Sequence, residues 1–297
     1  MVPVILFVYK RTDTLAVTLA SLKRNHVRQL IVYADAAKTE KDTEDVAAVR
    51  KMVSEIDWCE TELHFRDHNV GLGANIKDGV SRALEKHEAV IVCEDDLDFV
   101  EGTIDYMSAA LEHYADDERV MSVTGWTNKE ITPKDVGTMP YFDGRAECWL
   151  WGTWRRVWKG MSEMTAEEMM RKVSARGESP YRWGGDLPYM AKTELKSNIW
   201  AVRLVYLHIL HQGYCLRPPW SMVNHIGWGS GATNVAGRNW EDNGELQSAP
   251  PIPAVWPEPI LNPACEVLHR KMYVRPWSDV FPRLVPVVRA VLKWLCL

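Results

Sequence analysis

The segment that most constrains this chain, residues 90–98, reads Val-Ile-Val-Cys-Glu-Asp-Asp-Leu-Asp. Its first four residues are apolar or nearly so, which predicts a buried β-strand. A strand interior cannot hold charges, so Glu94, Asp95 and Asp96 belong at the carboxyl end of the strand, where open α/β sheets bind ligands. Converging acidic oxygens there suit a magnesium or manganese ion together with phosphate oxygens. The alternative is a solvated acidic loop, and a solvated position is expected for Asp98.

Strand-like and helix-like segments alternate along the first half of the chain. The apolar run over residues 2–9 is typical of a buried parallel strand. Further strands are expected at residues 30–34, 62–65, 90–93 and 120–124, and helices from Thr12 and at residues 41–56, 74–86 and 102–114. This β-α-β-α order predicts an α/β fold, with a mostly parallel sheet flanked by helices on both faces.

The alternation of expected strands and helices ends after Gly125. A Trp-rich stretch at residues 148–158 is followed by expected helices at residues 166–173 and 189–212. A Gly-rich loop at 221–234 and a proline-rich surface arm at 250–263 come next.

The composition favours an ordinary globular protein. The 297 residues are 46% hydrophobic and 25% charged, with a net charge of −5, which argues against a nucleic-acid partner. The six cysteines form no C-x-x-C pair, so neither a disulfide framework nor a zinc knuckle is expected. With no signal-peptide pattern and no apolar run of about 18 residues, we expect a cytoplasmic protein.

The tail, residues 280–297, has a different pattern. On a helical projection Arg283, Arg289 and Lys293 gather on one side, opposite a face rich in Leu, Val and Trp. This pattern is typical of an amphipathic helix at an anionic membrane surface. Packing of the same helix on the body of the protein is an equal alternative.

Glycines precede the expected helix at residues 74–86. In Asn69-Val70-Gly71-Leu72-Gly73 they allow close backbone approach, and the helix N-terminus behind them favours an anion. A plain turn explains the same residues equally well. Because these glycines do not follow the first strand, a nicotinamide-binding fold is a poor fit.

Five motifs now stand in a recognisable order. They are Tyr-Lys-Arg-Thr-Asp at 9–13, Asn-x-Gly-Leu-Gly at 69–73, Glu-Asp-Asp-Leu at 94–97, a Trp-Gly segment at 151–158 and Asn-x-Ile-Gly at 224–227. Over roughly residues 3–234 this order resembles the GT-A fold nucleotide-sugar glycosyltransferases. The likeness is strongest to the N-acetylglucosaminyltransferase I-like branch and to bacterial relatives from polysaccharide gene clusters.

The resemblance implies a donor site. Asp96 would coordinate Mn²⁺ or Mg²⁺, Asp95 would contact the donor ribose and Glu94 the donor sugar. A divalent ion on the diphosphate would neutralise the charge of the leaving group. The other implied donor contacts are Tyr9, Arg11, Asp35, Asn69, Gly71 and Lys77. For Tyr9, an aromatic residue at the edge of the core remains the alternative.

The resemblance also implies a role for His225 in the Gly-rich loop. A histidine near this position binds the metal or the diphosphate in many GT-A enzymes, and the loop closes over the donor. A loop histidine bonded to backbone is the equal alternative for His225.

The acceptor side is less determined. The related enzymes place a carboxylate just before a Trp-x-x-Arg segment, but residues 196–203 have none there. Asp186 and Glu194 are the nearest candidates for the general base of an inverting transfer. An uncatalysed or substrate-assisted proton transfer and retention stay open. Trp149, Trp151 and Trp154 would stack on acceptor sugars, but core filling is the favoured role for at least two of them.

Together these features predict a metal-dependent glycosyltransferase. It would move a sugar from a nucleotide diphosphate-sugar donor to a glycan or lipid-linked glycan acceptor, in surface polysaccharide biosynthesis at the cytoplasmic membrane. Residues 1–125 would be the donor half, residues 126–278 the acceptor half and residues 279–297 the amphipathic helix. The rivals are a sugar-phosphate nucleotidyltransferase, whose Gly-rich signature after the first strand is missing, and a non-catalytic glycan-binding protein.

Overall fold

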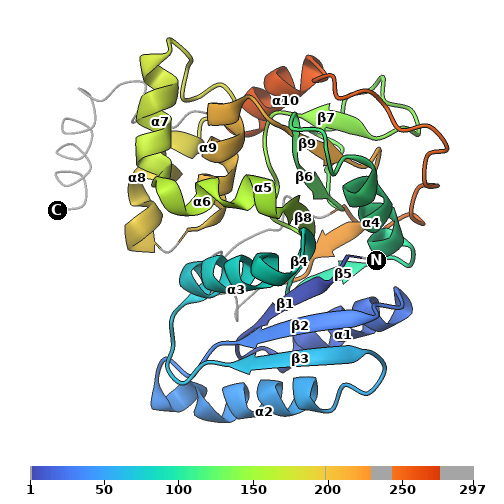
Figure 1. The fold of residues 1–297 in the computed structure, drawn as a ribbon, viewed down its shortest axis with the longest axis vertical. Helices are drawn as coiled ribbons and strands as arrows, with labels where there is room; N and C mark the ends of the chain where they lie inside the picture. Colours follow the sequence, from blue (N-terminus) through green and yellow to red (C-terminus); the bar gives the residue numbers. More distant parts are fainter. Residues whose placement is uncertain (1, 198, 229–242, 275–297) are drawn as a thin grey trace, which may run out of the picture.

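The computed structural model describes residues 2–197, 199–228 and 243–274. Its first half runs β1 (Val4–Val8), α1 (Thr12–Arg24), β2 (Gln29–Ala34), η1 (Glu40–Asp42), α2 (Thr43–Ser54), β3 (Glu60–Phe65), α3 (Leu72–Lys86), β4 (Ala89–Glu94), β5 (Leu97–Phe99), α4 (Thr103–His113) and β6 (Val120–Thr124) (Figure 1). The second half continues with β7 (Tyr141–Asp143), β8 (Trp151–Trp154), α5 (Arg155–Trp158), α6 (Gly160–Glu163), α7 (Ala166–Ala175), α8 (Leu187–Ser197), α9 (Ala201–His211), β9 (Tyr214–Arg217), β10 (Val223–His225) and α10 (Ala264–Met272).

One large sheet crosses both halves of the chain, in the strand order β3-β2-β1-β4-β8-β6-β9-β7. Strands β3, β2, β1 and β4 are parallel neighbours, and β6 is parallel to β9, whereas β8 and β7 run antiparallel to their neighbours. The predicted α/β fold with a sheet flanked by helices is confirmed. The sheet is parallel in the first half, as expected, and mixed in the second.

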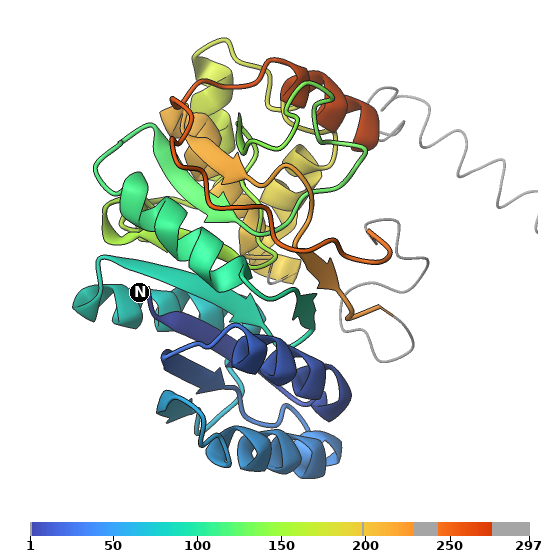
Figure 2. The same cartoon turned by 90° about the vertical axis from the view of Figure 1, so that its right-hand side faces the viewer.

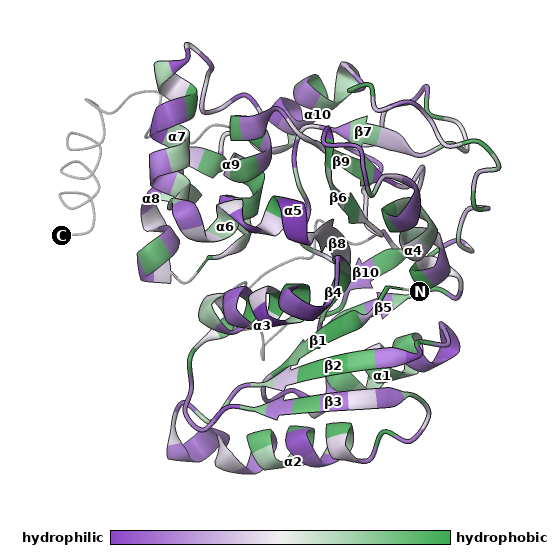
Figure 3. Cartoon of the chain, viewed as in Figure 1, coloured by the Kyte–Doolittle hydropathy of each residue, from purple (hydrophilic) through white to green (hydrophobic). Residues whose placement is uncertain are grey.

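The first-half strands form because their residues are apolar on both faces. Every residue of β1 and β6 is buried, and so are all but the first residue of β2. Figure 3 shows these strands as the hydrophobic centre of this half. Strand β3 is the edge strand and carries polar residues between apolar ones, since part of it faces solvent.

The helices of the first half cover opposite faces of the sheet. Figure 2 shows α1 and α2 on one side of β1–β3 and α3 on the other. Right-handed crossovers place them so, because β2 and β3 extend the sheet in one direction from β1 and β4 extends it in the other. The order of the strands reverses between β1 and β4. Open α/β sheets bind ligands at the carboxyl ends of the strands at such a point.

The Trp-rich segment forms a strand and the helix that follows it. All four residues of β8 are buried between β4 and β6. Trp151 lies 5.7 Å from Trp158 and 5.2 Å from Trp200 between ring centroids. The Nε1–H of Trp154 donates to the carbonyl of Leu111 at 3.1 Å. These indoles therefore fill the core between the two halves.

The single helix predicted over residues 189–212 is wrong. The structure has two helices there, α8 and α9. Trp200 stands at the N-cap of α9 and is only 4% exposed. Burial of this large ring beside Trp151 favours a turn over a continuous helix, because an indole contributes a large apolar area.

Two expected elements lie wholly or partly outside the described residues. The tail at 280–297 is outside them, and so are residues 229–234 of the Gly-rich loop. The proline-rich arm over 250–263 is described and has no helix, and one of its residues, Leu261, bridges to Phe142 of β7. Within the described ranges, no helix has both the length and the apolar character needed to cross a bilayer.

Candidate functional site

The candidate site lies at the carboxyl ends of β1 and β4. Residues Tyr9 to Arg11 follow β1, and Glu94 to Asp96 end β4, so two neighbouring parallel strands deliver both sets to the same edge of the sheet. The backbone N–H of Tyr9 donates to Oδ2 of Asp95 at 3.0 Å, which joins the two strand ends directly.

Asp96 is the point where three segments meet. Its Oδ2 lies 3.2 Å from Nε2 of His225 and 3.6 Å from Nη1 of Arg11. Arg11 also donates to the carbonyl of Gly227 at 3.2 Å. The predicted residues Arg11, Asp96 and His225 are therefore brought together from the ends of β1, β4 and β10.

A small second sheet places His225 there. Strand β10 pairs antiparallel with β5, with Asn224 opposite Asp98 and His225 opposite Leu97. The backbone N–H of Ile226 then donates to the carbonyl of Asp96 at 2.8 Å. Trp149 stacks on the imidazole of His225, with ring centroids 4.9 Å apart and planes 3° from parallel. The imidazole is thus fixed on both sides.

The cluster of Glu94, Asp95 and Asp96 has more carboxylates than cationic partners. Burial, together with the charge of Asp96, raises the pKa of Glu94 well above its ordinary value. The same causes, in the same order, raise the pKa of Asp95 to about 7. Arg11 is the only cationic guanidinium or ammonium in contact with Asp96 among the described residues. Additional positive charge at this point would favour the ionised forms of Glu94 and Asp95.

The residues at Asp96 fit a divalent cation that also binds phosphate. Within the described part of the chain, no three His, Cys, Asp or Glu side chains are arranged to hold a metal by themselves. Magnesium-type sites on nucleotides use one or two carboxylates and take their remaining ligands from phosphate and water. Gly227 leaves space beside Asp96 for a cation and its phosphate ligands. A Cβ at position 227 would lie 2.1 Å from Oδ2 of Asp96 and would occupy that space.

A solvated position was expected for Asp98, but in the structure its carboxylate has two partners. It forms an ion pair with Arg24 of α1 and accepts a hydrogen bond from Oγ of Ser21 at 2.9 Å. Its carboxylate therefore ties β5 to α1 and takes no part in the cluster around Asp96.

Asp35 has a different role from the predicted contact with the donor. It is 4% exposed, and its two oxygens accept four hydrogen bonds, from the N–H groups of Ala36, Val70 and Gly71 and from the amide of Asn69. These donors fill the acceptor capacity of a carboxylate. Gly71 has φ 78°, a conformation that favours glycine. Asp35 and Asn69 thus shape the turn before α3, and they do not present free polar groups to a ligand.

Tyr9 is half-buried beside this turn. Its hydroxyl accepts a hydrogen bond from the backbone N–H of Lys38 at 3.2 Å. Lys10 forms a 2.6 Å ion pair with Asp42. The segment after β1 is therefore fastened to the segment after β2, which makes this edge of the sheet a rigid frame for Arg11.

Glu194 is a structural residue, so its prediction as a general base is corrected. It is 3% exposed, its Oε1 accepts from Nε of Arg203 at 2.6 Å, and its Oε2 accepts from the backbone N–H of Ala166 at 2.8 Å. The carboxylate joins α8 to α9 and to the first turn of α7. Lys77, predicted to bind donor, lines a small cavity of about 110 Å³ next to Glu194, and burial lowers the pKa of its amine.

Asp186 is also engaged. Its two oxygens accept from Nη1 and Nη2 of Arg145 at 3.0 and 2.8 Å, a bidentate pair. Arg145 is buried and its guanidinium stacks on Tyr273, 3.9 Å from the ring centroid. A carboxylate held in this way is a poor acceptor of a proton from a substrate hydroxyl.

The three predicted acceptor tryptophans separate into two groups. Trp151 and Trp154 are 0% and 3% exposed, so these two fill the core, as expected for at least two of the three. Their prediction as sugar-stacking residues is corrected, because no ligand reaches a face that the core covers. Trp149 is half-buried and packs on His225, with its edge against the ring of Trp126. Of the three, it is the indole that borders the candidate site.

No protein-family model matches this chain, and no curated protein matches it either. Among solved structures, the mannosyltransferase PcManGT from Pyrobaculum calidifontis, in complex with GDP-Man and Mn²⁺, is 13% identical over 59% of this chain and 52% of its own, with a TM-score of 0.38. A putative glucose-1-phosphate thymidylyltransferase from Bacillus anthracis, in complex with sucrose, is 7% identical over 55% of this chain and 76% of its own, with a TM-score of 0.35. HddC from Yersinia pseudotuberculosis is 10% identical over 53% and 78%, with a TM-score of 0.34. The match thus spans about half the length of the mannosyltransferase chain.

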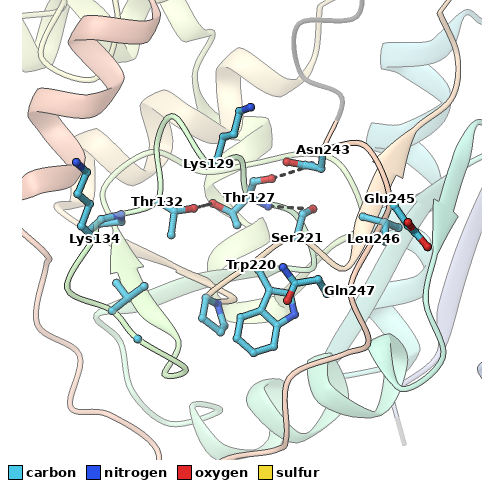
Figure 4. Close-up of a pocket in the computed structure, with 14 residues that line it drawn as sticks. Thr127, Lys129, Thr132, Lys134, Trp220, Ser221, Asn243, Glu245, Leu246 and Gln247 are labelled. Atoms are coloured by element: carbon cyan, nitrogen blue, oxygen red, sulfur yellow. Dashed lines mark hydrogen bonds between the residues drawn. The ribbon is translucent and has the colours of Figure 1, made fainter.

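A larger pocket, which the motifs did not indicate, lies beside the candidate site. It has a volume of about 480 Å³ and is lined by parts of residues 127–137, 219–221 and 243–247. Figure 4 shows Trp220 and Gln247 on one side, Lys129 on the other and Thr127 and Ser221 between them. The sequence signal for it was Trp220, directly before the Gly-rich loop.

Proposed function

We propose that this protein is a GT-A type glycosyltransferase that binds the diphosphate of a nucleotide-sugar at Asp96, with a divalent cation. The observation that carries the proposal is the meeting of Asp96, His225 and Arg11 at the carboxyl ends of β1 and β4. A carboxylate and an imidazole are metal ligands, and a guanidinium binds phosphate oxygens.

Each residue has a distinct part in this proposal. Asp96 and His225 would hold Mn²⁺ or Mg²⁺, which would supply Lewis-acid neutralisation of the diphosphate. Arg11 would release its contact with Asp96 and bind a phosphate oxygen instead. Trp149 keeps the imidazole of His225 in place by stacking. Asp95 and Glu94 would lie against the ribose and the donor sugar.

The reaction would be glycosyl transfer to a hydroxyl group. The bond between the anomeric carbon and the phosphate oxygen breaks, and the nucleoside diphosphate leaves with the electron pair. A bond forms from that carbon to the acceptor oxygen, and the hydroxyl proton is released to the solvent. We favour an inverting outcome.

The decisive experiment measures thermal unfolding with UDP, GDP, CDP and dTDP, each with and without Mn²⁺. A ligand at about one hundred times its Kd stabilises a protein by about 2.7 kcal/mol. We expect one nucleotide to raise the melting temperature in a manganese-dependent way. The shift should vanish in Asp96→Asn and persist in the matched variant Asp98→Asn, because Asp98 pairs with Arg24.

The outcomes separate the rival functions. No stabilisation by any nucleotide, with Asp96→Asn behaving like the parent, would overturn the proposal. Release of pyrophosphate from a nucleoside triphosphate and a sugar 1-phosphate would assign a nucleotidyltransferase instead. Saccharide binding with no nucleotide binding would assign a glycan-binding protein.

We also propose a lipid-linked glycan acceptor at the inner face of the cytoplasmic membrane, in surface polysaccharide assembly. The support is the sequence of residues 280–297, which lie outside the described residues, with Arg283, Arg289 and Lys293 on one side of the helical projection. The full chain should sediment with vesicles rich in phosphatidylglycerol, and a chain ending at residue 279 should not. Equal sedimentation of both would refute the membrane role.

A further inference from the structure

The pocket beside the candidate site, here called the Trp220 pocket, combines an indole with two cationic side chains. Trp220 is half-exposed, and its Nε1–H donates to the carbonyl of Ser248 at 3.0 Å, which fixes the orientation of the ring. Lys129 and Lys134 line the same pocket, and neither forms an ion pair with any residue that the structure describes. Glu245 is the only carboxylate among the lining residues.

The pocket is built onto the strand that carries His225. Ser221 lines the pocket and stands four residues before His225, so the two are at most about 14 Å apart along the chain. The hydroxyl of Ser221 donates to the carbonyl of Val223, the first residue of β10. A short oligosaccharide spans such a distance.

A second set of contacts links the pocket wall at Thr127 to His225. Thr127 follows Trp126, whose ring lies 4.8 Å from Trp149 in an edge-on contact, and Trp149 stacks on His225. The amide of Asn243 donates to the carbonyl of Thr127 at 3.0 Å, which closes the pocket across the two walls. Both walls therefore have a short connection to the candidate transfer site.

The lining favours one class of ligand. A flat indole suits the apolar face of a sugar ring, and hydroxyl and amide groups such as those of Thr132 and Gln247 suit its hydroxyls. Ammonium groups without a carboxylate partner favour an anion. These cations stand out in a chain with a net charge of −5.

We propose that the Trp220 pocket binds the acceptor of the transfer, and that this acceptor is a saccharide with a carboxylate or phosphate group. The role as acceptor site rests on the function proposed above. Trp220 would stack on the sugar and Lys129 and Lys134 would bind the anionic group. The acceptor hydroxyl would then point toward the donor at Asp96 and His225.

Saturation-transfer NMR with the full chain tests the pocket directly. The probes are D-glucuronic acid, α-D-glucose 1-phosphate and the neutral methyl α-D-glucoside. We expect at least one anionic sugar to bind more tightly than the neutral one. Tighter binding of glucuronic acid would indicate a glycan carboxylate, and tighter binding of glucose 1-phosphate would indicate the phosphate of a lipid-linked sugar.

Two variants and one control locate the binding. The double variant Lys129→Gln/Lys134→Gln should weaken the anionic sugars about tenfold, which corresponds to about 1.4 kcal/mol, and should leave the neutral sugar unchanged. Trp220→Leu should weaken all three. Lys172→Gln, which removes an exposed lysine on α7, should behave like the parent.

The nucleotide measurement keeps the two proposals apart. If UDP or another nucleotide stabilises every variant while the lysine replacements leave sugar binding unchanged, the Trp220 pocket is not the acceptor site. If anionic sugars bind in the pocket while no nucleotide binds, the transferase proposal fails, and the acceptor role fails with it. Equal binding of anionic and neutral sugars would overturn the anionic acceptor.

Discussion

The half-buried carboxylates at the end of β4 and the buried carboxylate of Asp143 in the second half differ in their partners. At the end of β4, Glu94, Asp95 and Asp96 stand in sequence with Arg11 as their nearby cation. In the second half Asp143 accepts from both Arg217 and His269 at 2.7 Å. The first cluster is short of positive charge and the second is neutralised inside the protein.

The pKa directions follow this difference. Burial and neighbouring carboxylates raise the pKa of Glu94 and of Asp95. Burial would also raise the pKa of Asp143, but His269 and Arg217 hold it well below its ordinary value. A carboxylate with a complete set of partners stabilises a fold, whereas a buried cluster without them is a candidate for ligand binding. Each prediction below tests one side of this comparison.

The largest effect is expected from Arg217→Met. The guanidinium of Arg217 is fully buried against Asp143, so its loss leaves a buried carboxylate whose remaining partners are His269 and the backbone N–H of Arg145. Removing one member of a buried pair costs about 3–5 kcal/mol. Unfolding in urea measures this free energy. The control Arg82→Met removes an exposed partner of Asp78 and should lower the free energy of unfolding far less, because solvent screens exposed ion pairs.

If the two variants had equal free energies of unfolding, the pairing in the second half would contribute no more than a surface ion pair. The contrast between the two groups of carboxylates would then be lost.

A smaller loss of stability is expected from Glu194→Gln. Glu194 accepts from Arg203 and from the first turn of α7, and hydrogen bonds to charged groups contribute about 1.5–3 kcal/mol. The variant should unfold more easily and yet keep its nucleotide-dependent shift in melting temperature. Unchanged stability with a hundredfold lower rate of sugar transfer would instead identify Glu194 as the base.

The first half of the fold could be predicted closely from the sequence. Strand β6 has the expected bounds, Val120–Thr124, and β1, β2 and β4 differ by a residue or two. Their apolar runs are continuous because both faces are buried. The second half was harder, since β8 is defined by its neighbours β4 and β6, and a run of tryptophans has neither a helical nor a strand period.

The site could be predicted only in part, for a related reason. Glu94 to Asp96 follow a recognisable strand, so their place at its end is a local property. The approach of His225 to Asp96 depends on the pairing of β5 with β10, strands of three residues each that are too short to give a pattern. The four donors that surround Asp35 come from chain segments that the sequence does not show to be close.

The raised pKa of Asp95, in the cluster at the end of β4, should make the free energy of unfolding fall as pH rises. The pKa of Asp95 is about 7 in the folded protein, against about 3.9 in an unfolded chain. The folded state therefore holds more protons between these values, and stability falls as pH rises through them. Without metal, Asp95→Asn should be more stable than the parent by at least about 1 kcal/mol at pH 8, with the difference absent near pH 4.

Chemical unfolding at the two pH values measures this, with Asp98→Asn as the matched control that should show no such pH-dependent gain. A difference in stability between Asp95→Asn and the parent that is the same at pH 4 and pH 8, in the absence of metal, would contradict the raised pKa of Asp95.

The smallest change in stability with the clearest functional effect is expected from Gly227→Ala. The added Cβ would lie 2.1 Å from Oδ2 of Asp96, so the carboxylate has to move from its place beside His225. Because a side chain can shift there, we expect a loss of about 1 kcal/mol or less, but no manganese-dependent stabilisation by nucleotide. Gly177→Ala is the inverse control, since its φ of 80° opposes a side chain and no atom lies within 4 Å of the added Cβ. Gly177→Ala should lower the free energy of unfolding and keep manganese-dependent nucleotide binding. If Gly227→Ala also kept this binding, the metal and diphosphate would lie away from Asp96.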